Sequence, residues 1–196
     1  TYLSLRRLEN EVIKELIILD KGRNGKQVSG QVTFGQEGLN PIRVSISQFY
    51  GIEINDFAVT VAKTALWIAE SQMMKETEEI VHAPLDFLPL KTNAYIVEGN
   101  ALRLPWEDII SKNKLNYIMG NPPFVGYSLQ SKEQKEDILS IYVDEKGKAY
   151  KTAGKIDYVA GWYFKAAQLM QGTAIRTAFV STNSITQGEQ VAGVWK

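Results

Sequence analysis

The sequence has no cysteine and only one histidine, His82. Without cysteine, these 196 residues can form no disulfide, no thiolate zinc site and no cysteine nucleophile. The single histidine has no second imidazole or thiolate near it in the sequence, so we expect no metal site. The lack of cysteine also fits a cytoplasmic protein, because disulfides are rare in that compartment.

An excess of charge of either sign is absent as well, because 22 basic residues balance 22 acidic ones. A protein that binds nucleic acid by itself usually has a basic excess, since phosphate contacts dominate the affinity. Either nucleic acid is not the partner, or most of the binding surface lies in another region. No apolar run approaches the length of a membrane span and the first residues do not resemble a signal peptide, so we expect no membrane partner.

Helix-like and strand-like segments alternate along the chain. Apolar spacing predicts an amphipathic helix over residues 2–19, and a second helix that begins at Asn55 and Asp56 and runs to about Lys75. Residues 131–143 are also expected to be helical, and Asp157 is expected to cap a helix that runs to Met170. Apolar runs predict strands at residues 48–54, 94–99, 115–119 and 174–182. This order is typical of an α/β domain with a mainly parallel sheet and helices on both faces.

Three of the predicted strands end in polar side chains, namely Glu53, Asn100 and Asn121. In open parallel sheets, ligands bind at the carboxyl ends of the strands. A buried apolar strand that is followed at once by a polar residue is therefore the pattern expected of a binding or catalytic site.

The turn Asn121-Pro122-Pro123-Phe124 carries the most specific chemistry. Prolines lack an N–H group and restrain the residue before them, so the turn presents carbonyl oxygens with few competing donors. The side-chain carbonyl of Asn121 and the backbone carbonyl of Pro122 can accept both hydrogens of a planar amine, which frees the nitrogen lone pair for attack. Phe124 offers a flat face for a heteroaromatic ring. The alternative is a proline-rich turn that only closes a strand.

This tetrapeptide resembles the catalytic motif of S-adenosylmethionine-dependent DNA adenine-N6 methyltransferases. The stretch "QFYGIEINDFAVTVAKTALWIAE" is similar to the second motif region of a narrower bacterial group, the MmeI-like fused restriction–modification enzymes. "GNALRLPW" and "DYVAGWYFKAA" stand where that group has its third and fifth motifs. The resemblance implies a Rossmann-like class I methyltransferase fold that is incomplete here. Residues 1–196 would then be one partial catalytic domain, from the second to about the sixth motif, with no second domain.

The resemblance also implies a role for each site residue. Glu53 matches the acidic residue that takes the ribose hydroxyls of the methyl donor, and Ile54 would lie against the adenine ring of the donor. Asn100, with Ala101 beside it, falls where many relatives carry an acidic residue that meets the adenine amine. Asp157 would line the donor cleft. The alternatives are an exposed carboxylate at a helix start for Glu53, a turn residue for Asn100 and a helix cap for Asp157.

The substrate implied is an adenine flipped out of double-stranded DNA, which would be bound mainly by regions that this chain lacks. The family resemblance places a target-recognition domain, and in some members a nuclease domain, in those regions. Two other functions remain open. One is N-methylation of RNA or of a protein glutamine, although those relatives usually carry tyrosine at the position of Phe124. The other is a DNA-specificity or scaffold fragment without activity.

The chain alone is expected to be inactive. In the family, a first strand and a glycine-rich loop hold the methionine end of the donor, and they should precede Thr1; "GQEGLN" does not match that loop. We therefore predict that residues 1–196 alone bind S-adenosylmethionine weakly or not at all. Isothermal titration that gave a micromolar affinity would contradict this prediction.

Overall fold

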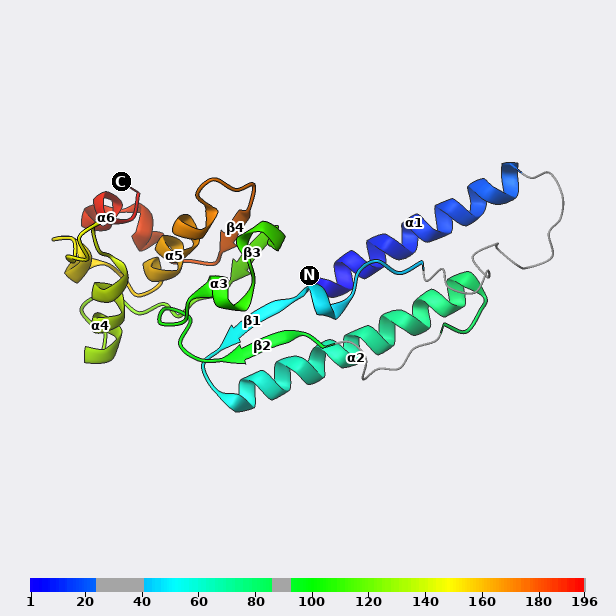
Figure 1. The fold of residues 1–196 in the computed structure, drawn as a ribbon, viewed down its shortest axis with the longest axis horizontal. Coiled ribbons are helices and arrows are strands. Elements are labelled where there is room, and N and C mark those ends of the chain that lie inside the picture. Colours follow the sequence, from blue (N-terminus) through cyan, green and yellow to red (C-terminus); the bar gives the residue numbers. More distant parts are fainter. Residues whose placement is uncertain (24–40, 86–92, 196) are drawn as a thin grey trace. The chain divides into compact units, whose positions relative to one another are not determined.

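The computed structural model describes residues 1–23, 41–85 and 93–195 (Figure 1). The segment "GQEGLN", residues 35–40, lies outside this part. The chain divides into two compact units, Thr1–Glu98 and Gly99–Lys196, and each is described by itself. The part of the chain that is described contains no helix with the length and apolar character that crossing a membrane requires.

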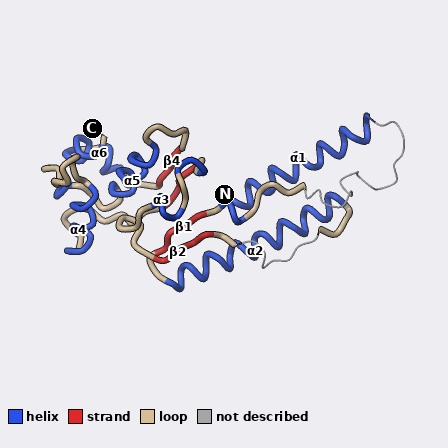
Figure 2. The backbone as a smooth tube through the Cα atoms, in the orientation of Figure 1, coloured by secondary structure: helices blue, strands red, loops and turns tan. Residues whose placement is uncertain are grey.

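The first unit combines two long helices with a pair of parallel strands (Figures 1 and 2). Helix α1, Tyr2–Arg23, lies beside helix α2, Asp56–Val81. Strand β1, Tyr50–Glu53, pairs in parallel with β2, Tyr95–Glu98. Ile96 of β2 is buried together with apolar residues of α2, so one face of the strand pair is covered by that helix.

Helix α2 begins where the sequence predicts. The side chain of Asn55 accepts a hydrogen bond from the backbone N–H of Ala58 at 2.8 Å, which satisfies one of the free donors at the helix start. The predicted end at about Lys75 is wrong, because the helix continues to Val81. Thr77 and Val81 are buried, so contacts of the last turns with α1 stabilise a segment that looks polar in the sequence.

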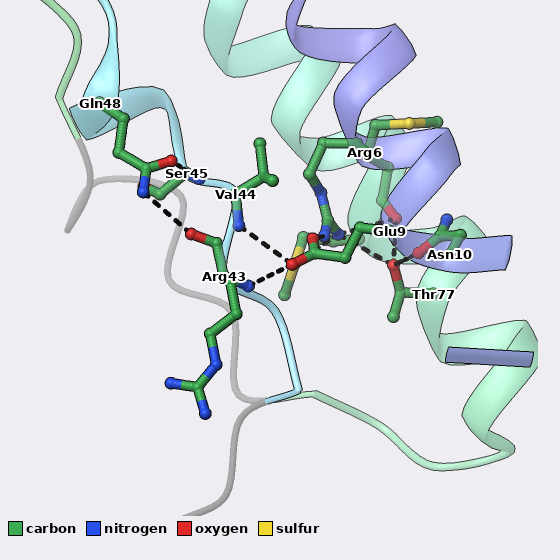
Figure 3. A network of polar contacts seen from close by, with 10 residues as sticks. Arg6, Glu9, Asn10, Arg43, Val44, Ser45, Gln48 and Thr77 are labelled. Atoms are coloured by element: carbon green, nitrogen blue, oxygen red, sulfur yellow. Dashed lines mark hydrogen bonds and ion pairs between the residues drawn. The ribbon is translucent and has the colours of Figure 1, made fainter. Parts of the chain in front are cut away.

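A buried polar network joins α1, α2 and the chain after residue 40 (Figure 3). The guanidinium of Arg6, which is fully buried, donates to the carboxylate of Glu9 and to Thr77 Oγ1, the latter at 2.9 Å. Glu9 also accepts hydrogen bonds from the backbone N–H groups of Arg43 and Val44. One ion pair therefore ties together three segments that are distant in the sequence.

The second unit contains the other strand pair and the remaining helices. Strand β3, Tyr117–Gly120, pairs in parallel with β4, Arg176–Phe179. The hydrophobic core of this second unit is formed around helices α4, Lys132–Ile141, and α5, Ala160–Met170. Helices α3, Trp106–Ile109, and α6, Val191–Val194, are single turns.

The α/β class and the parallel pairing of strands are confirmed. The described residues form two separate two-stranded sheets, β1–β2 and β3–β4, one in each unit. All four predicted strands are present, each four residues long and each shorter than its apolar run in the sequence.

Candidate functional site

The turn after β3 presents two unoccupied hydrogen-bond acceptors. The backbone carbonyl of Gly120 accepts the last hydrogen bond between β3 and β4, from Val180 N–H at 3.0 Å, and Asn121 follows immediately. Asn121 is exposed, whereas Pro122 is buried and holds the turn against the unit. Among the described residues, neither the amide of Asn121 nor the carbonyl of Pro122 has a hydrogen-bond partner. Both oxygens are therefore free of donors from the described part of the protein.

Phe124 lies on the surface beside this turn. Its side chain is 48% exposed, and within the described ranges its ring stacks on no other aromatic side chain. An exposed aromatic ring next to free acceptors can stack on a planar base whose amine is held by those acceptors. Phe124 is thus free to stack on a base, and its arrangement with the two acceptors stays a prediction.

The buried carboxylate of Asp157 holds the segment that follows the turn. Its Oδ1 accepts the backbone N–H of Tyr127 at 2.9 Å, and its Oδ2 accepts the hydroxyl of Ser184 at 2.6 Å. The backbone N–H of Tyr158 donates to the carbonyl of Val125 at 2.9 Å. Residues 125–127 are therefore held by hydrogen bonds to residues 157 and 158, so the chain just downstream of the turn Asn121–Phe124 is anchored in this unit.

Asp157 is not the helix cap that was offered as an alternative. Helix α5 begins at Ala160, with Val159 at the cap position, so the predicted cap lies two residues too early. Burial alone would raise the pKa of Asp157, but hydrogen bonds from Ser184, Gln190 and the backbone of Tyr127 outweigh it and hold the pKa below its usual value. The carboxylate is therefore ionised at neutral pH and serves as an acceptor.

Asn100 and Ala101 lie in a tight turn after β2. Asn100 Oδ1 accepts the backbone N–H of Leu102 at 2.9 Å, which is the turn role that the sequence left open. Its Nδ2 donates to Oδ2 of Asp137 at 2.8 Å. Ala101 contributes its backbone carbonyl, which accepts Trp106 Nε1–H at 2.8 Å and the ammonium of Lys165 at 3.0 Å.

Asp137 and Lys165 were missed in the sequence. Asp137 is 3% exposed on the same face of α4 as the buried Ile138 and Ile141. An acidic residue at a position where helical spacing requires an apolar one was the available signal. Lys165 gives no such signal, because its acceptors come from a loop some sixty residues away. Burial lowers the pKa of Lys165 to about 8.

In the first unit, Glu53 is the last residue of β1 and Ile54 follows it. Both side chains are exposed, Ile54 by 65%. In the described part of the chain, the carboxylate of Glu53 has no hydrogen-bond or ion-pair partner. An unpaired carboxylate beside an exposed apolar side chain can accept two hydroxyls while the apolar group contacts a ring.

Comparison with known proteins assigns the family. A family model described as "MmeI, DNA-methyltransferase domain" matches residues 1–196. The chain belongs to this family. An MmeI-type DNA-methyltransferase domain is thus what the sequence resemblance indicated, and this prediction is confirmed.

Two relatives support the MmeI assignment. DNA methyltransferase A of Bacillus subtilis (strain 168) is 41% identical over 198 residues, which cover all of this chain and 20% of that protein. The solved structure of the type IIL restriction–modification enzyme MmeI in complex with DNA matches all of this chain with a TM-score of 0.82 and 41% identity. The chain covers 24% of that structure's chain, so it spans between a fifth and a quarter of these relatives.

Proposed function

We propose that this chain is the methyl-transfer part of an S-adenosylmethionine-dependent DNA adenine-N6 methyltransferase in a bacterial, cytoplasmic restriction–modification enzyme. The observation that carries the proposal is the turn Asn121–Phe124, in which Asn121 and Phe124 are exposed and two carbonyl oxygens have no donor among the described residues. The rest of the enzyme would supply the target-recognition surface and a fused nuclease. A Rossmann-like class I fold, completed by the first strand and glycine-rich loop of the family, is the finer architecture that we infer.

The turn residues act on the target amine. Asn121 Oδ1 and the carbonyl of Pro122 each accept one N–H of the adenine amine, which draws the nitrogen out of conjugation with the ring and exposes its lone pair. Phe124 stacks on the flipped base and fixes its plane. The described residues offer no strong general base next to the turn, and none is needed, because alignment of the two reactants supplies most of the rate.

S-adenosylmethionine is the methyl donor that we infer, from the family and from the chemistry of the residues that each unit presents. When bound, this cofactor supplies an electrophilic methyl group on a sulfonium. Glu53 would accept both ribose hydroxyls, and Ile54 would contact the adenine ring of the donor. Asn100 Oδ1 would accept a hydrogen bond from the adenine amine of the donor, and Ala101 would contact the same adenine ring. Asp157 would act indirectly, by holding the residues after the turn, because its carboxylate already accepts hydrogen bonds from the N–H of Tyr127 and the hydroxyl of Ser184.

The test of the function uses the full-length protein and a donor with a labelled methyl group. Duplex DNA, RNA and a release-factor protein are offered separately, and the labelled product is digested and identified by mass spectrometry. N6-methyladenine from DNA is the expected product. Label in RNA or in a glutamine side chain, or N4-methylcytosine in DNA, would replace the proposal, and no transfer to any substrate would favour the scaffold interpretation.

Replacing Glu53 with glutamine in the full-length protein is expected to raise the KM for the donor about tenfold to a hundredfold, because hydrogen bonds to a charged acceptor are lost. The kcat at saturating donor should stay within about threefold, since Glu53 does not touch the target amine. Glu79→Gln, an exposed site on α2, is the matched control. Equal donor KM values for the two variants would remove Glu53 from the donor site.

A further inference from the structure

We propose that Asp137 is a positioning residue for the methyl donor: it fixes the amide of Asn100 so that an oxygen, and not an N–H group, faces the adenine amine of the donor. This inference rests on the proposed function and adds to it. It explains how an uncharged side chain can select a nucleoside that carries an amine.

The carboxylate of Asp137 is buried and accepts three hydrogen bonds. Its Oδ2 accepts from Asn100 Nδ2 at 2.8 Å and from the hydroxyl of Tyr158 at 2.7 Å, and its Oδ1 accepts from Arg103 Nε. These donors hold the pKa of Asp137 below its usual value, although burial acts in the opposite direction. The carboxylate is thus ionised at neutral pH, and its negative charge lies next to Nδ2 of Asn100.

This charge decides which way the amide of Asn100 points. A flipped amide would place Oδ1 against the carboxylate of Asp137 and Nδ2 against the N–H of Leu102, so that both hydrogen bonds would be replaced by repulsion. In the observed orientation, Oδ1 keeps one lone pair after it accepts from Leu102. The donation from Nδ2 to a carboxylate also polarises the amide and makes Oδ1 a stronger acceptor.

The backbone of the same loop is held independently. The ammonium of Lys165 donates to the carbonyls of Ala101, Leu102 and Leu104, and lies 5.4 Å from the ring centre of Trp106. Its three donors therefore meet three acceptors. With the backbone fixed from α5, the orientation of the Asn100 side chain is the remaining variable, and Asp137 on α4 determines it.

The experiment measures donor selectivity in the full-length protein. S-adenosylmethionine and an analogue with a 6-oxo group in place of the adenine amine are titrated calorimetrically. The unaltered protein should bind the amine form more tightly, because Oδ1 accepts from an amine and repels a carbonyl oxygen. Asp137→Asn is expected to weaken binding of S-adenosylmethionine about tenfold and to reduce the preference for the amine form by a similar factor. Glu136→Gln, an exposed neighbour on α4, should change neither.

A double variant separates positioning from a general structural role. In Asn100→Asp with Asp137→Asn, the amide at 137 donates to the carboxylate at 100, which still presents an oxygen to the donor. The amine preference should return to within about threefold of the unaltered protein, since the hydrogen bond is rebuilt in reverse. A residue that only stabilises the fold would give no such recovery.

Two outcomes would overturn the inference. The first is an unchanged amine preference in Asp137→Asn. The second is a double variant whose amine preference is no greater than that of Asp137→Asn. Where Asp137→Asn does not fold, the second outcome is a double variant that has no amine preference. Hydrogen exchange of the amides in residues 99–106 is followed in parallel and should be faster in Asp137→Asn than in Glu136→Gln. A protein that binds the donor with the expected selectivity but methylates no DNA would refute the proposed function and leave the role of Asp137 standing.

Discussion

Replacing Asn121 with alanine in the full-length protein is expected to abolish detectable methyl transfer to DNA. The change removes one of the two oxygens that hold the amine, so that Pro122 alone remains and the nitrogen can return to the plane of its ring. Removal of a single preorganised polar group at a reacting centre typically costs about a hundredfold to a thousandfold in kcat. Because Asn121 makes no hydrogen bond within the described residues, its loss should not disturb the fold.

The measurement separates chemistry from binding. Transfer of a labelled methyl group to duplex DNA gives kcat, and calorimetric titration gives the donor Kd, which should stay within about twofold because Asn121 does not touch the donor adenosine. Asn113→Ala, an exposed site in the second unit, is the matched control, and Asn121→Asp should retain part of the activity because it keeps an oxygen. Turnover of Asn121→Ala at the rate of the control would exclude Asn121 from the mechanism.

The second large effect is expected at Arg6. This guanidinium is fully buried, and Arg6→Met would leave Glu9 and Thr77 without their shared donor. Breaking a buried ion pair from one side costs about 3–5 kcal/mol. We expect the lower end of this range, because the backbone N–H groups of Arg43 and Val44 still donate to the charge that remains on Glu9. The loss should appear as faster hydrogen exchange along α1 and the last turns of α2, measured on the intact protein.

Two further variants test this explanation. Arg7→Met changes the neighbouring exposed arginine and should alter exchange by less than about 0.5 kcal/mol. Adding Glu9→Gln to Arg6→Met should recover part of the loss, because no isolated charge then remains. Exchange in Arg6→Met that matched Arg7→Met would show that the network in Figure 3 contributes little to stability.

Features with a local cause were predictable from the sequence. Asn55 caps α2 through its own third neighbour, and the stiffness of Pro122 and Pro123 is a property of the residues themselves. Features with a distant cause were not. The final turns of α2 are buried because Arg6 and Asn10 contact Thr77, and no nearby residue signals this.

The candidate site residues also divide into those whose placement has a local cause and those whose placement has a distant one. Asn121 follows a strand directly and Glu53 is the last residue of one, so their exposure at strand ends could be predicted from position alone. Asp157 was recognised, but its hydrogen bonds to Tyr127 and Ser184 cross long stretches of chain, and a helix cap was the nearest local explanation. The proposed role of Asp137 could not be predicted, because it depends on three hydrogen-bond donors that only the fold brings to its carboxylate.

The hydrogen bonds of Asp157, which hold the residues after the turn, limit how far the C-terminal boundary of a usable expression fragment can be moved back. Ser184 and Gln190, both beyond the last strand, complete the hydrogen bonds of that aspartate. A truncation placed just after β4 would look harmless on a map of secondary structure. It would nevertheless remove hydrogen bonds that hold Asp157, and with it the residues after the turn Asn121–Phe124, so boundaries chosen for biochemical work on this domain belong downstream of α6.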